Sequence, residues 1–166
     1  FSGGGELDNG LNVALSFVID QGDDTAIGSG PFDSHSVTIS SDAMGSLKFS
    51  GEGGSSALTA LDGTAAGDIW DSFDVTGSIT PTGLGGGNNS MMYTLPAMID
   101  GVAINASYTP RGTGADSSTA FGVTYTGVEG LTASYGMGDG SSESQDGTAF
   151  KLSYAFGPIT AGYSTY

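Results

Sequence analysis

The feature that most constrains the fold of this chain is a regular alternation of apolar with small polar residues. Leu11, Val13 and Leu15 share one parity, and Asn12 and Ala14 lie between them. A period of two places successive side chains on opposite faces of a β-strand. The pattern is clear at 11–19, 102–108, 121–125, 131–137, 150–156 and 159–163, and shorter strands are expected at 36–41, 46–51 and 91–95. The chain is therefore predicted to be all-β, with no helix outside its long loops.

The connections between these strands alternate between two lengths. Short turns are expected at 7–10, 42–45, 99–101, 127–130 and 157–158, and long polar loops at 20–34, 52–90, 110–118 and 138–147. The Asn-Gly and Asp-Gly pairs in the short turns supply the positive φ angles that tight hairpins need. This order predicts an antiparallel up-and-down meander with short turns at one end of the strands and long loops at the other.

The polar face of the expected strands carries Ser, Thr, Asn, Gly and Ala, whereas a solvent-facing soluble sheet usually carries Lys and Glu. Small polar residues suit a water-filled lumen, with the apolar face toward lipid. Short turns that alternate with long loops are typical of transmembrane β-barrels of the outer membrane. The sequence has no run of about 20 apolar residues that could form a membrane helix.

The composition and charge of the chain limit the classes of partner that it could bind. Glycine fills 30 of 166 positions and hydrophobic residues reach only 37%, a mixture that would also fit disorder if the alternation were absent. With 18 acidic residues against 3 basic ones, the net charge is −15, so nucleic acid is a poor partner. The acidic balance suits a cation-attracting cavity or a surface that faces divalent ions. No cofactor is expected, beyond weak binding of divalent cations by acidic outer loops.

Aromatic residues fall near the ends of the expected strands, where rings at lipid-headgroup depth would place them. They are Tyr108, Tyr125, Tyr135, Phe150, Phe156 and Tyr163. The core of an ordinary β-sandwich is the alternative interpretation of these rings.

Four segments together resemble the general porins of Gram-negative bacteria, in their alphaproteobacterial branch. They are 5–11 (GELDNGL), 41–47 (SDAMGSL), 92–96 (MYTLP) and 101–108 (GVAINASY). The resemblance implies a sixteen-stranded barrel, of which residues 1–166 would be a single-domain segment of about ten strands, the second through the eleventh. Residues 1–6 would then end the second strand of the barrel, and the fourth strand of this chain would be its fifth. It also implies an outer-membrane location in a bilayer with lipopolysaccharide, a homotrimer, and passive diffusion of small hydrophilic solutes and ions.

In that family, the loop after the fifth strand folds into the barrel and narrows the pore, and the long loop 52–90 stands at the matching place. Its acidic residues Asp62, Asp68, Asp71 and Asp74 are the expected constriction residues. Ile69, Trp70 and Phe73 could pin the loop to the wall. By parity, the basic residues Lys48, Arg111 and Lys151 face the lumen, where acidic and basic groups would set up a transverse field. Isolated surface charges are the alternative for all three bases.

The sequence offers no catalytic constellation, and no enzyme activity is expected. His35 is the single histidine, and no Ser-His-Asp or His cluster can be assembled around it. A rim position is its expected place. The alternative to a channel is a secreted or cell-surface acidic β-rich protein with a structural or binding role.

Overall fold

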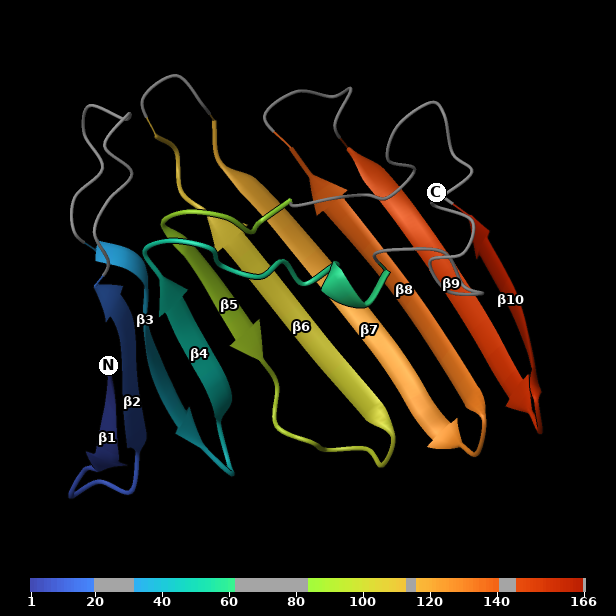
Figure 1. Cartoon of the computed structure of the whole chain (residues 1–166), viewed down its shortest axis with the longest axis horizontal. Helices are drawn as coiled ribbons and strands as arrows, with labels where there is room; N and C mark the ends of the chain where they lie inside the picture. Colours follow the sequence, from blue (N-terminus) through green and yellow to red (C-terminus); the bar gives the residue numbers. More distant parts are fainter. Residues whose placement is uncertain (20–31, 62–83, 113–115, 141–145, 166) are drawn as a thin grey trace.

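The computed structural model describes residues 1–19, 32–61, 84–112, 116–140 and 146–165. Ten strands form one sheet in which each strand pairs antiparallel with the next in sequence (Figure 1). They are β1 (Ser2–Glu6), β2 (Asn12–Ile19), β3 (Phe32–Ser41), β4 (Gly45–Ser50), β5 (Ser90–Thr94), β6 (Val102–Thr109), β7 (Ser118–Val128), β8 (Leu131–Asp139), β9 (Gly147–Phe156) and β10 (Ile159–Thr165). A short 3₁₀ helix, η1 (Thr59–Leu61), follows β4. The predicted all-β, up-and-down architecture is confirmed; β3 and β7 begin a few residues earlier than the sequence pattern indicated.

The five predicted short turns lie at one end of the strands, which we call the short-turn edge, although the connection from β5 to β6 (95–101) has seven residues (Figure 1). The strand ends that the other connections join lie at the opposite end, which we call the long-loop edge. Glycine makes these turns possible where the chain needs positive φ, as at Gly10 (80°) and Gly130 (75°). At Gly130 a second constraint applies, because an added Cβ would overlap the carbonyl oxygen of Ala155. Tight turns of this kind fix the register of each hairpin.

The two faces of the sheet differ as the alternation predicted. One face carries large apolar side chains that are neighbours across the strands, such as Ile104, Val123, Tyr135 and Phe150 on β6 to β9. The opposite face carries Ala103, Thr124, Ser134 and Lys151 in the adjacent row. We call the first the apolar face and the second the small-residue face.

Apolar burial lies on the small-residue face and not within a second sheet layer. The buried apolar residues of the described chain are Ala57, Leu58, Leu61, Ala120 and Ala149, with Leu84 packed against them. On the apolar face, by contrast, large side chains stay open: Phe121 is 39% exposed and Tyr135 42% exposed. The interior of an ordinary sandwich would have buried these rings.

The sheet is open in the described chain, since β1 and β10 each pair with one neighbour. Among the described residues, none of the helical structure has the length and apolarity needed to cross a membrane.

Candidate functional site

Both described arms of the loop 52–90 lie across the small-residue face. The first arm leaves β4 and passes in front of β5, β6 and β7 as far as η1, and the second arm returns to β5 (Figure 1). The arms are joined to each other by a backbone bridge, in which Gly54 N–H donates to Gly87 O at 2.9 Å and Gly87 N–H donates to Gly54 O at 2.7 Å. Ser56 Oγ–H also donates to the carbonyl of Leu84 at 2.6 Å.

Polar side chains of the wall hold these arms in place. The backbone N–H of Ala57 donates to Ser107 Oγ on β6 at 2.9 Å, and this contact is buried. The N–H of Gly85 donates to Ser118 Oγ at 3.0 Å, and Thr109 Oγ1 donates to the carbonyl of Gly86 at 2.9 Å. Backbone groups of the two loop arms thus form hydrogen bonds with side chains of β6 and β7. Buried backbone N–H and C=O groups need such partners.

The described loop residues that pack against the wall are ones that the sequence analysis did not single out. The predicted apolar anchors Ile69, Trp70 and Phe73 lie outside the described residues. Leu58 and Leu61 of the first arm are 2% and 1% exposed, and they pack over β8 together with Leu84. A sequence signal for these contacts exists at Gly122 and Gly136, which share the parity of the small-residue face, but parity alone predicts only pore lining there. Gly138 is predicted to lie in the loop 138–147, whereas it lies in β8.

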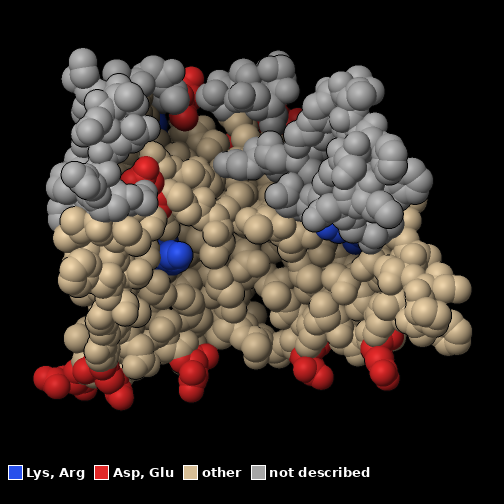
Figure 2. Space-filling view, in the orientation of Figure 1, with Lys and Arg blue, Asp and Glu red and all other residues tan. Residues whose placement is uncertain are grey.

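The expected acidic constriction residues Asp62, Asp68, Asp71 and Asp74 also lie outside the described residues. Two of the expected wall bases have a clear place. Lys48 on β4 is the cross-strand partner of Thr38 and Met92, in the row that continues to Ser107. Lys151 on β9 is the partner of Ser134. Both are half-buried on the small-residue face, where Figure 2 shows basic side chains.

Arg111 lies two residues beyond the end of β6, at the long-loop edge of the sheet. Its guanidinium Nε forms an ion pair with Asp116 at 3.2 Å, and both side chains are well exposed, at 79% and 57%. An exposed pair of this kind contributes little stability. The structure therefore brings Arg111 close to an acidic partner at the long-loop edge of the sheet.

Acidic residues gather along the short-turn edge. Figure 2 shows them as a row of red side chains on the side of the sheet opposite the long loops. Glu6, Asp8, Asp42, Asp100 and Glu129 lie in or beside four of the five short turns, and all are exposed. The three basic residues of the chain lie elsewhere, so this edge has one sign of charge.

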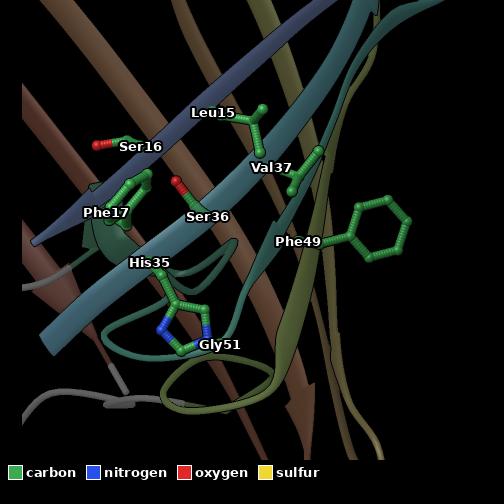
Figure 3. Close-up of a pocket in the computed structure, with 8 residues that line it drawn as sticks. All are labelled: Leu15, Ser16, Phe17, His35, Ser36, Val37, Phe49 and Gly51. Atoms are coloured by element: carbon green, nitrogen blue, oxygen red, sulfur yellow. The ribbon is translucent and has the colours of Figure 1, made fainter. Parts of the chain in front are cut away.

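His35 lies on the apolar face toward the long-loop end of β3. It pairs with Phe17 on β2, and its ring occupies the space above Gly51. Here a shallow hollow of about 410 Å³ opens between β2, β3 and β4. In Figure 3, Leu15, Val37 and Phe49 point to one side of the sheet, whereas the hydroxyls of Ser16 and Ser36 point to the other. Elsewhere too, the described chain holds no group of three or more His, Asp or Glu side chains that could bind a metal ion.

A single-layer antiparallel meander, apolar on one face and small and polar on the other, defines the class of transmembrane β-barrel proteins. The chain belongs to the Gram-negative porin family, whose family model matches residues 1–166. Porins are a family of outer-membrane channels rather than enzymes. The match confirms the predicted resemblance to Gram-negative porins. Among curated proteins and solved structures, no match to the chain was found.

Proposed function

We propose that this chain forms the wall of a water-filled channel in the outer membrane, through which small hydrophilic solutes and ions diffuse passively. The observation that carries the proposal is the opposite chemistry of the two faces of one sheet. Exposed Phe121, Tyr135 and Tyr154 suit contact with lipid, and the Ser, Thr and Gly face suits water. The described arms of the loop 52–90 cross the small-residue face and thereby narrow the passage beside it.

In the described part of the chain, β1 and β10 each leave one edge unpaired, which supports closure of the sheet by further strands. Hydrocarbon contains no water to satisfy unpaired backbone groups, so a transmembrane sheet must close on itself. We propose a barrel of sixteen strands, a homotrimer, and an outer membrane that contains lipopolysaccharide; porin membership and the resemblance to the alphaproteobacterial branch support these features.

The charges support a weak preference for cations. We propose that Asp62, Asp68, Asp71 and Asp74 of the loop 52–90 line the constriction, and that Lys48, Lys151 and Arg111 are the basic groups across from them. Acidic residues outnumber basic ones 18 to 3, and charged rings or clusters along a pore raise the local concentration of counter-ions. Divalent cations could associate weakly with the acidic outer loops through the same field.

Reconstitution into planar bilayers tests the proposed function. The full-length protein should require detergent for solubility and should produce stepwise ionic currents, with a reversal potential in a KCl gradient that shows mild cation preference. A secreted binding protein would instead be soluble without detergent and electrically silent. A clear anion preference would contradict the charge argument but leave the channel intact.

A further inference from the structure

Three glycines on β7 and β8 lie beneath the described arms of the loop 52–90. Gly122 and Gly136 are buried and Gly138 is half-buried, all on the small-residue face. Glycine weakens the interior of a strand, because it loses more backbone freedom on folding and offers no side chain to pack. A glycine there often marks a close approach by another part of the chain, and the contacts at these three positions show one.

Each glycine is covered by an identified part of the loop. A Cβ at Gly122 would overlap the carbonyl oxygen of Ala57, and one at Gly136 would overlap the side chains of Leu58 and Leu61. A Cβ at Gly138 would lie 3.1 Å from Leu84 Cβ and 3.2 Å from Leu58 Cδ1. Both arms of the loop therefore rest directly on the backbone of the wall. We call Gly122, Gly136 and Gly138 the loop seat.

Gly147 shows that this contact is not shared by every glycine on the small-residue face. It lies on β9, belongs to that face and pairs with Gly138, yet nothing lies within 4 Å of the position of its missing Cβ. A general need for small residues on this face would not distinguish Gly147 from the three glycines of the loop seat, whereas contact with the loop does.

We propose that the loop seat sets how far the loop projects into the lumen and thereby sets the width of the channel. The three glycines are positioning residues, since they act through the loop and need not touch the solute. Side chains at these positions would lift Ala57, Leu58 and Leu84 away from the wall and into the passage. The inference rests on the proposed function, which supplies the channel whose width is measured.

Single-channel conductance tests the loop seat. Gly122→Ala would force the loop backbone to move, and Gly136→Val would displace two leucines. We expect both variants to show lower conductance than the wild type, with more frequent brief closures. Gly147→Ala is the matched control and should conduct as the wild type does. Conductance of the seat variants at or above the wild-type value would overturn the proposal.

A cross-linking experiment gives a readout that does not depend on conduction. The chain has no cysteine, so introduced pairs are free of background. The 3.1 Å between Leu84 Cβ and a Cβ at Gly138 is slightly shorter than the spacing in a disulfide, about 3.5–4.5 Å, so small shifts allow a bond. We expect Leu84→Cys with Gly138→Cys to form a disulfide readily under mild oxidation, and Leu84→Cys with Gly147→Cys to form little. Adding Gly136→Val should reduce the first cross-link.

The two readouts separate the failure of this proposal from the failure of the proposed function. If the wild type conducts but Gly122→Ala behaves as Gly147→Ala does, the loop seat does not set the channel width. Equal cross-linking of the two cysteine pairs would also contradict the seat. If the wild type carries no current, the channel function itself is refuted, whatever the cross-links show.

Discussion

Two residues of the β7–β8 hairpin, one on each face of the sheet, meet different surroundings. Val123 on β7 belongs to the apolar face, where its partners are Ile104 and Tyr135. Thr132 on β8 is exposed on the small-residue face, with the parity of Ser134. In a transmembrane barrel the first position faces lipid and the second faces the lumen, so the same substitution should have very different costs.

We expect Val123→Lys to lower the free energy of unfolding by about 2–4 kcal/mol, because a lysine that faces lipid near the middle of the bilayer must be desolvated. Thr132→Lys should change it by less than about 0.5 kcal/mol, the usual range for exposed positions. Urea unfolding of the protein in lipid vesicles measures both. Equal costs at the two positions would contradict the assignment of the faces.

Charge removal at single residues addresses the lumen. Lys48→Gln and Lys151→Gln should each shift the reversal potential toward stronger cation preference, because both positions lie on the small-residue face. Arg111→Gln is the comparison, since its charge is already paired with Asp116 at an exposed edge, and it should shift the potential less. A larger effect of Arg111→Gln would place the selective region near the long-loop edge instead.

Hairpins are the elements that set the register of the sheet. All five short turns join strands that pair antiparallel, with one register shift between Tyr125 and Val128 in the β7–β8 hairpin, and a slip by one residue along a strand would send apolar side chains to the lumen. Gly10 and Gly130 both have positive φ, but they differ in surroundings: the space beside Gly10 is open, whereas Gly130 lies against the carbonyl of Ala155.

This difference predicts unequal costs for the same substitution. Gly10→Ala should lower the free energy of unfolding by about 1–2 kcal/mol, which is the backbone strain of an L-residue in the left-handed region. Gly130→Ala should cost more, because the added methyl group also displaces β9. Parallel urea titrations in vesicles, with wild-type protein as reference, give the two values. Similar values would show that the hairpin relaxes around the clash.

At the scale of the whole molecule, acidic residues are concentrated at one end of the sheet. Glu6, Asp8, Asp42, Asp100 and Glu129 form an acidic border at the short-turn edge. Each turn has a local sequence that permits a tight bend, and the fold then places the carboxylates of these turns on one rim. Such a rim attracts cations to that mouth of a channel over a distance set by the Debye length of the salt solution.

Replacing the turn acids together, as Asp8→Asn, Asp42→Asn, Asp100→Asn and Glu129→Gln, should weaken cation preference at low ionic strength. In about 1 M salt the Debye length falls to roughly 3 Å, so the difference from wild type should nearly disappear there. Reversal potentials at two mean KCl concentrations measure this. A difference that persists unchanged in concentrated salt would indicate a structural effect of the substitutions rather than a field.

The sequence by itself determined the strands, the short turns and the two faces, because alternation and turn chemistry are local properties of the chain. Parity alone assigned Phe121, Val123 and Lys151 to their sides of the sheet. Only the tertiary structure decided what lies on the small-residue face. Leu58 and Gly136 are far apart in sequence, and no local pattern distinguishes a glycine that faces water from one that supports a loop. The contact became visible only when strands β6 to β8 and both arms of the loop were placed together in space.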